Sequence, residues 1–180
     1  MCADWQPIES ARLRLRRPTI LDANAIFTRY SSDPVVTKYL GWPRHTAIED
    51  ARAFVALSDE QWSKWAAGPL LIEDLITGAL LGSTGVSFDT SDAAVTGYVL
   101  ARDAWGCGYA TEALGAVVAR QSRLSIQSLY ALCHPDNPAS VRVLEKCGFV
   151  LDAQLRRHLV FPNLGTSEPQ DCLRFVRTIT

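Results

Sequence analysis

Two glycines separated by one residue, Gly106 and Gly108, can bind an anion without any side chain. They follow a short apolar run, residues 95–100, and they precede a helical pattern. Glycine accepts positive φ angles, which lets several backbone N–H groups converge on one point. The N–H groups of the first helical turn have no partner within the helix and lie at the positive end of its dipole. The stretch therefore favours a phosphate or diphosphate ligand.

An ordinary glycine-rich connection between a strand and a helix remains the alternative, because Gly-x-Gly alone is weak evidence for a phosphate site. A Rossmann motif needs a third glycine, and Thr111 stands at that place. A P-loop needs Gly-Lys followed by Ser or Thr, and this triplet is absent from the sequence.

A second segment with chemical potential begins after the β-like run at residues 129–133. Asn137 is a suitable helix N-cap, Pro138 fits the first helical position, and Gly148 fits the position after the helix. This punctuation predicts a helix of about ten residues with Val141 and Leu144 facing the core. Asn137 can serve as a cap and nothing more, or it can also contact a ligand.

Together, the two segments resemble the GNAT acetyltransferase superfamily, in its RimJ/RimL-like branch. The motifs are Trp-Gly-x-Gly-Tyr-Ala-Thr-Glu-Ala at residues 105–113 and Asn-Pro-Ala-Ser-x-x-Val-Leu-Glu-Lys-x-Gly-Phe at residues 137–149. The pair in this order and spacing is far more specific than either part. The resemblance extends over most of the chain, including residues 9–13 and the strand that contains Gly97 and Tyr98.

The resemblance implies acetyl-coenzyme A as the donor cosubstrate and an amine as the acceptor. The pyrophosphate would bind the backbone of Gly106, Cys107, Gly108, Tyr109, Ala110 and Thr111. The strand before this turn would splay from its neighbour, and the pantetheine arm would pair with Leu100, Ala101 and Arg102. Asn137 and Ser140 would also contact the coenzyme.

The catalytic candidates are Ser140 and Glu112. Many members of the family have a tyrosine as general acid where Leu144 stands here, and Ser140 at the start of the same helix is the natural substitute. Glu112 is the carboxylate of the glycine motif, but an acid in a first helical turn commonly serves the helix dipole. Asp103 and Glu73 are weaker candidates for a base. Asp103 is also an unexpected acid close to a predicted pyrophosphate.

The acceptor side is less determined by the sequence. Trp42 and Tyr98 are candidate substrate-binding residues, and packing in the core is the simpler role for both. The acceptor is a protein N-terminus of the ribosomal type or a small-molecule amine. The alternative function is a non-catalytic acyl-coenzyme A sensor or partner-binding module, which would explain the missing tyrosine.

Composition restricts the remaining possibilities. The 180 residues suit one N-acetyltransferase domain over residues 1–180, as a monomer or homodimer. A net charge of -1 makes nucleic acid an unlikely partner, and the apolar runs are too short for a membrane span. The N-terminus lacks a signal-peptide pattern. Five cysteines without a Cys-x-x-Cys pair and three histidines indicate no disulfide framework and no metal site, which suits the cytoplasm.

The elements that position these residues can also be predicted. Residues 12–16 alternate between arginine and leucine, which predicts a strand with a salt-bridged arginine face, or an RNA-binding strip as the less favoured alternative. Helices are expected at about residues 20–30, after Thr19 and Asp22, and from the Thr46-x-x-Glu49 box toward Trp65. Residues 35–40 would form a short element. With the resemblance, we expect an α/β (α+β) fold: a mixed, mostly antiparallel central sheet of six to seven strands, with helices on both faces and a splayed strand pair at the acyl-coenzyme A site.

Overall fold

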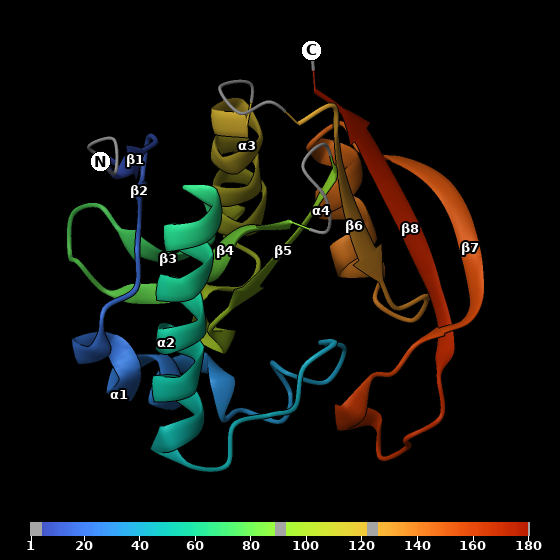
Figure 1. Ribbon diagram of the computed structural model, residues 1–180, viewed down its shortest axis with the longest axis horizontal. Coiled ribbons are helices and arrows are strands. Elements are labelled where there is room, and N and C mark those ends of the chain that lie inside the picture. Colours follow the sequence, from blue (N-terminus) through green and yellow to red (C-terminus); the bar gives the residue numbers. More distant parts are fainter. Residues whose placement is uncertain (1–4, 89–92, 122–125, 180) are drawn as a thin grey trace.

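The computed structural model describes residues 5–88, 93–121 and 126–179, and it is built around one mixed sheet (Figure 1). Among these residues the sheet has eight strands in the order β1-β2-β3-β4-β5-β6-β8-β7. Within these ranges the β5–β6 pair alone is parallel, and the other strand pairs are antiparallel. The strands are β1 (Ile8–Glu9), β2 (Leu13–Arg16), β3 (Pro69–Asp74), β4 (Leu80–Phe88), β5 (Ala93–Leu100), β6 (Ser128–Cys133), β7 (Val150–Leu159) and β8 (Gln170–Thr178). The predicted fold class is confirmed, and the sheet is slightly wider than expected.

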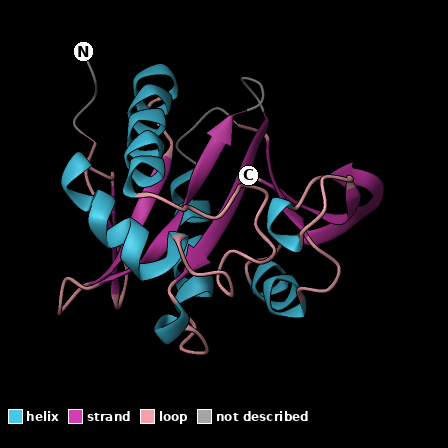
Figure 2. Cartoon of the chain, turned by 90° about the horizontal axis from the view of Figure 1, so that it is seen from below, coloured by secondary structure: helices cyan, strands magenta, loops and turns pink. Residues whose placement is uncertain are grey.

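Helices cover both faces of the sheet, and the strands form the middle layer (Figure 2). On one face, α3 and α4 contribute Leu114, Val117 and Leu144 to the larger apolar core. On the other face, α1 and α2 contribute Ile26 and Val55 to a second core. The helical elements are η1 (Ile20–Asp22), α1 (Ala23–Ile26), η2 (Phe27–Ser31), α2 (Ile48–Trp65), η3 (Arg102–Ala104), α3 (Tyr109–Gln121), α4 (Pro138–Lys146) and η4 (Pro162–Leu164).

The beginnings of the helices follow from side-chain caps, with two corrections to the expectations. Asp22 accepts hydrogen bonds from the Thr19 backbone N–H at 2.7 Å and hydroxyl at 2.8 Å, as predicted. The segment after it is a 3₁₀ turn, one α-helical turn and a π-helical turn, instead of one helix over residues 20–30. At α2 the capping acid is Asp50 and not Glu49, because Asp50 is the residue that accepts from the N–H groups before the helix, at 2.8 and 3.0 Å.

The order of the elements places the start of α3 and the start of α4 at the same end of the sheet. α3 follows β5 through η3, and α4 follows β6 through a short loop. Because β5 and β6 are parallel, their carboxyl ends lie at one edge. Ligands of open sheets bind where the carboxyl ends of neighbouring strands meet. The predicted short element at residues 35–40 is a series of turns between η2 and α2.

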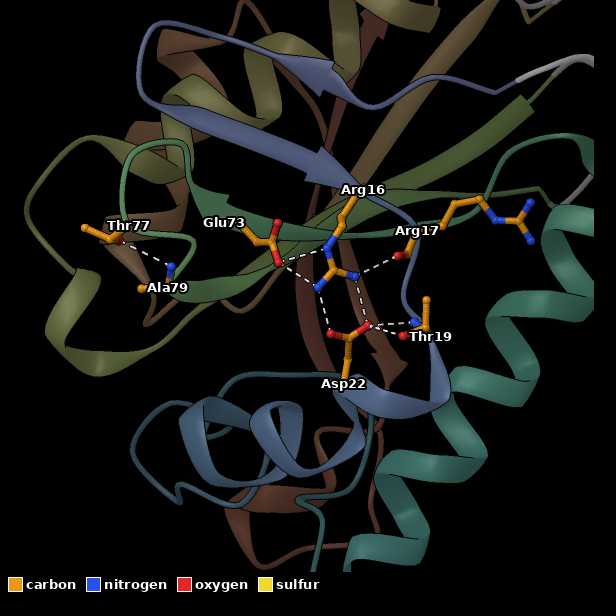
Figure 3. A network of polar contacts seen from close by, with 7 residues as sticks. All are labelled: Arg16, Arg17, Thr19, Asp22, Glu73, Thr77 and Ala79. Atoms are coloured by element: carbon orange, nitrogen blue, oxygen red, sulfur yellow. Dashed lines mark hydrogen bonds and ion pairs between the residues drawn. The ribbon is translucent and has the colours of Figure 1, made fainter.

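Arg16 joins the N-terminal strand to two other elements (Figure 3). Its guanidinium contacts Asp22 of η1 at 2.7 Å and Glu73 of β3 at 2.6 Å. On the same strand, Leu13 and Leu15 have exposed fractions of 0%. The alternation of residues 12–16 therefore produces one apolar face in the core and one ion-paired arginine face, as the pattern predicts.

The role of Asp22 leads to a pH-dependent prediction. Burial would raise its pKa, but hydrogen bonds from Arg16 and Thr19 outweigh burial and lower the pKa below its ordinary value of 3.8. Its contribution to stability is therefore present at neutral pH and is lost as the pH falls through the folded-state pKa. Asp22→Asn should lower the free energy of unfolding at neutral pH by about 1 kcal/mol, the usual value of a cap.

Denaturant titrations of the wild type and of this variant at neutral and at acid pH test this expectation. The difference between the two proteins should narrow below a pH of about 4. Asp59→Asn is the control, because Asp59 is exposed and contacts Arg17 only at 3.5 Å. A difference that stays constant with pH would contradict the assignment.

Candidate functional site

The sheet opens between β5 and β6. The two strands pair at Ala93–Ser128, Ala94–Leu129 and Val95–Tyr130, and within the described residues the pairing stops there. β5 continues to Leu100 against β4, and β6 continues to Cys133 against β8, so each strand is held by its outer neighbour alone. Figure 1 shows the two strands moving apart. The predicted splayed pair is therefore present, and its inner edges can pair with an extended, amide-containing ligand.

Backbone hydrogen bonds show which residues at the end of β5 face this opening. Ala101 donates its N–H to the Leu81 carbonyl at 2.7 Å, and its carbonyl accepts from Ala104 at 2.9 Å. In an antiparallel pair the bonded residues alternate, so the backbone of Leu100 points away from β4 and into the opening. The Leu100 carbonyl accepts a hydrogen bond from the Trp105 indole at 2.9 Å. Of the three residues predicted to bind the pantetheine arm, Leu100 has backbone groups that face the opening. The N–H and carbonyl of Ala101 are already hydrogen-bonded within the protein.

The glycine turn has the shape of an anion-binding loop. Gly106 and Gly108 have φ angles of 75° and 81°, in the left-handed region that favours glycine. The first helical hydrogen bond of α3 runs from the Glu112 N–H to the Gly108 carbonyl at 3.1 Å. Among the described residues, the amides of residues 106–111 have no hydrogen-bond acceptor. These six amides, including those of Cys107, Tyr109, Ala110 and Thr111, are therefore available to a ligand.

Glu112 is tied to the N-terminal strand. One of its carboxylate oxygens accepts from the Ser10 hydroxyl and from the Arg12 N–H, both at 2.8 Å. The other oxygen accepts from the Arg12 Nε at 2.8 Å. Burial would raise the pKa of Glu112, but the hydrogen bonds from Ser10 and Arg12 outweigh it and the pKa is lowered. These contacts join the start of α3 to the N-terminal segment. The catalytic role of Glu112 stays a prediction, and none of these contacts supports it.

Two ion pairs hold η3 against the segment that follows α1. Asp103 forms a two-pronged pair with Arg29, with both distances at 2.9 Å. Arg102 contacts Asp33 at 2.5 Å. The four side chains line a shallow surface depression of about 540 Å³. The unexpected acid near the glycine turn is therefore compensated by its own arginine, which removes the repulsion that an unpaired Asp103 would exert on an anion.

Three predicted residues come together at the start of α4. The Asn137 side chain accepts from the Ser140 N–H at 3.2 Å, which confirms the cap. The Ser140 hydroxyl lies 2.9 Å from the Tyr98 hydroxyl, so Tyr98 reaches from β5 to α4. Burial raises the pKa of Tyr98, although the Ser140 hydrogen bond opposes this, so the phenol stays protonated. Leu144 has an exposed fraction of 1% and belongs to the core.

The two candidate acceptor residues lie on opposite faces of the sheet. Tyr98 packs against the core that contains α3 and α4. Trp42 packs against the core that contains α1 and α2. Their predicted roles in substrate binding remain predictions, and the geometry separates them: Tyr98 belongs with Ser140, and Trp42 belongs with the loop between η2 and α2.

No sequence signal pointed to Asn163, which joins the loop between η2 and α2 to η4. Its side-chain amide donates to the carbonyls of Thr37 at 2.8 Å and Trp42 at 2.9 Å. Its side-chain oxygen accepts from the Arg44 N–H at 2.8 Å. The surrounding Pro-Asn-Leu-Gly is typical of an ordinary loop. One side chain therefore determines the path of a loop more than a hundred positions earlier.

His134, another residue that sequence reasoning missed, stands directly after β6. Its Nδ1 accepts from the Asp136 N–H at 3.1 Å, so the ring proton is on Nε2, which faces Gln170 at 3.2 Å. The ring stacks on Tyr39 with centroids 4.9 Å apart. His134 thus connects the end of β6 with the Trp42 loop through its ring face and with β8 through Nε2, while Nδ1 fixes the turn after β6.

Comparison with known proteins gives a consistent result. Residues 12–150 match the family described as Acetyltransferase (GNAT) domain. The N-acetyltransferase YoaA of Bacillus subtilis is 34% identical over 160 residues, which is 84% of this chain and 87% of YoaA.

Solved structures share the fold. The Salmonella typhimurium acetyl transferase that modifies the N-terminal serine of ribosomal protein L7/L12 has a TM-score of 0.85 at 20% identity, covering 97% of this chain and 100% of its own. The spermidine N-acetyltransferase of Vibrio cholerae, solved with CoA and spermine, has a TM-score of 0.78 at 18% identity, covering 94% and 97%. Separately, no helix within the described ranges combines the length and apolar character that a bilayer span needs.

We expect Asn163→Ala to release the Trp42 loop. The loss of its three hydrogen bonds should lower the free energy of unfolding by about 1–3 kcal/mol. Amide hydrogen exchange should accelerate more at residues 37–45 than in α3, because the three bonds join η4 to that loop. Asn24→Ala, at an exposed position of α1, is the control. Unchanged exchange at residues 37–45 would show that other contacts hold the loop.

Proposed function

The chain belongs to the GNAT acetyltransferase family, and on that premise we propose that it transfers the acetyl group of acetyl-coenzyme A to a primary amine. The observation that carries the proposal is the opening between β5 and β6, with the free amides of the glycine turn at one side and the start of α4 at the other. An extended thioester ligand with a diphosphate at one end matches this arrangement.

The coenzyme would lie along the opening in one direction. Its diphosphate binds the amides of residues 106–111, where the α3 dipole favours negative charge. Its pantetheine arm pairs with the backbone of Leu100 and Arg102 as a partial extra strand. Its thioester then lies near Asn137 and Ser140, at the start of α4.

The reaction would be a direct transfer. The neutral amine attacks the thioester carbon, a C–N bond forms, the C–S bond breaks, and the coenzyme thiolate leaves. The Leu100 N–H, which points into the opening, is suitably placed to stabilise the developing oxyanion. The Ser140 hydroxyl can pass a proton to the leaving thiolate, and the solvent in the opening returns one to Ser140. Positioning of the two reactants contributes much of the rate.

The proton that the attacking nitrogen loses passes to water. An alkyl amine has a pKa near 10, so a proton acceptor assists the reaction at neutral pH. The three carboxylates considered for this role are already ion-paired: Glu112 with Arg12, Asp103 with Arg29, and Glu73 with Arg16. We therefore assign the proton transfer to solvent in the opening.

The acceptor is proposed as a class and not as one compound. The relatives named above include one that acts on a protein N-terminus and one named for spermidine, so both a protein amine and a small-molecule amine fit the family. A panel containing both kinds, in an assay that measures release of the coenzyme thiol, tests the proposal. Amine-dependent release is expected. Binding of acetyl-coenzyme A without release by any amine would contradict it.

Gly108→Val should abolish the rise in melting temperature that acetyl-coenzyme A causes. A β-branched residue is strained at a φ of 81°, and its Cβ would lie 3.6 Å from the Arg12 guanidinium, so the turn should lose its binding shape. Gly78→Val is the matched control, because Gly78 has a φ of 71° in the β3–β4 turn with open space around it. The control should show similar destabilisation and a normal coenzyme shift. A normal shift in Gly108→Val would place the diphosphate elsewhere.

Asn137→Ala should lower the free energy of unfolding by about 1 kcal/mol through the lost cap. It should also weaken the binding of acetyl-coenzyme A, measured by calorimetry. Asn137→Ser separates the two roles, because serine is an equally good cap but lacks the side-chain amide. We expect Asn137→Ser to recover stability and not affinity. Recovery of both would leave Asn137 as a cap alone.

A further inference from the structure

We propose that Arg12 is a positioning residue for the coenzyme, because its guanidinium fixes the glycine turn in the shape that binds the diphosphate. This inference rests on the proposed function. It adds a residue that directly precedes β2 and lies about a hundred positions before the turn in the sequence. The family resemblance assigns this role to the backbone of the turn, and from the sequence alone Arg12 was simply one member of an arginine-rich face.

Arg12 contacts three different parts of the turn. Its NH1 donates to the Cys107 carbonyl at 3.1 Å. Its guanidinium lies over the Tyr109 ring, 4.5 Å from the centroid. Its Nε and NH2 contact Glu112 at 2.8 and 2.7 Å. The contacts thus span the loop from between the two glycines to the first turn of α3.

The contact with the Cys107 carbonyl determines where the next amide points. The peptide group is planar and trans, so the carbonyl of Cys107 and the N–H of Gly108 point in opposite directions. When Arg12 holds the carbonyl on its own side, the Gly108 N–H is directed to the other side. The flanking glycines would otherwise allow this peptide to rotate, since glycine has wide conformational freedom. A turn held in its binding shape pays less ordering entropy when a ligand arrives.

The contact with Glu112 removes a second obstacle. Glu112 is a carboxylate in the first turn of α3, the same turn whose amides would hold the diphosphate. An unpaired negative charge there would repel the ligand. Arg12 and Ser10 together occupy both of its oxygens. The carboxylate thereby becomes part of the support of the turn.

Arg12 itself sits on a fixed base. Its carbonyl accepts from the Leu75 N–H at 2.8 Å, and the next residue, Leu13, is fully buried and paired with Asp74. The side chain therefore projects toward the turn from the firmly held start of a strand. Glu112 holds the backbone of Arg12 from the opposite direction, through its N–H at 2.8 Å.

Arg14 offers a matched control. It lies two residues further along β2, and its side chain has an exposed fraction of 47% against 46% for Arg12. It also forms one ion pair, with Glu9 at 3.0 Å. The difference between the two arginines is the partner: Arg12 contacts the coenzyme turn and Arg14 contacts β1. The two side chains carry the same charge and have nearly the same exposure.

The experiment compares Arg12→Ala, Arg12→Lys and Arg14→Ala. The dissociation constant of acetyl-coenzyme A is measured by calorimetry, and KM for each substrate and kcat are measured with an active amine. Arg12→Ala should weaken acetyl-coenzyme A binding by about tenfold, the value of one charge-assisted hydrogen bond, and raise its KM accordingly. kcat at saturation and the KM of the amine should stay within about twofold, as should every constant of Arg14→Ala.

Arg12→Lys keeps the charge but loses the planar fork, so it should recover only part of the affinity. Melting temperatures without coenzyme show whether any variant is merely unfolded, and the split between KM and kcat separates positioning from general damage. A wild type that binds acetyl-coenzyme A, together with an Arg12→Ala variant that binds it equally well, would overturn this inference alone. A wild type that does not bind acetyl-coenzyme A would overturn the proposed function and this inference with it.

Discussion

The interruption of one strand pair is the constraint on which the arrangement of the site depends. Within the described residues β5 and β6 pair at three positions, and both strands remain bound to their outer neighbours. The sheet is therefore open in the middle while each of the two diverging strands keeps one hydrogen-bonded neighbour. Unpaired backbone groups in the interior of a protein are costly unless something bonds to them. An opening of this kind is suited to a ligand that carries amides of its own.

Ion pairs from the first part of the chain hold the loop that borders this opening. Arg29 and Asp33 hold η3, and Arg12 holds the glycine turn through Glu112. Exposed ion pairs contribute little to global stability. Their importance here is geometric, because a loop with two left-handed glycines has many alternative shapes. The N-terminal segment thus restricts a loop that its own sequence leaves flexible.

Structural features could be predicted from the sequence when the interacting residues are close together along the chain, and not when they are far apart. Local signals were reliable: Asn137 caps α4, Leu13 and Leu15 are buried, and the Gly106–Gly108 turn precedes α3 as expected. A local signal was displaced by one residue at α2, where Asp50 is the cap. Contacts across the chain left no mark in the sequence. Asn163 stands in an ordinary loop pattern, and the charge of Arg12 does not reveal that its partner is Glu112.

The Asn163 contacts also bear on how the protein is made. Residues 37–45 leave the ribosome long before Asn163 has been translated, and three of the hydrogen bonds that fix them come from this one side chain. The chain leaves the ribosome N-terminus first, and a domain generally folds as a unit. The loop that carries Trp42 therefore obtains these three hydrogen bonds only after η4 has been synthesised. A nascent chain halted before η4 would already contain the glycine turn and α4, but it would lack the Asn163 side chain that holds the Trp42 loop.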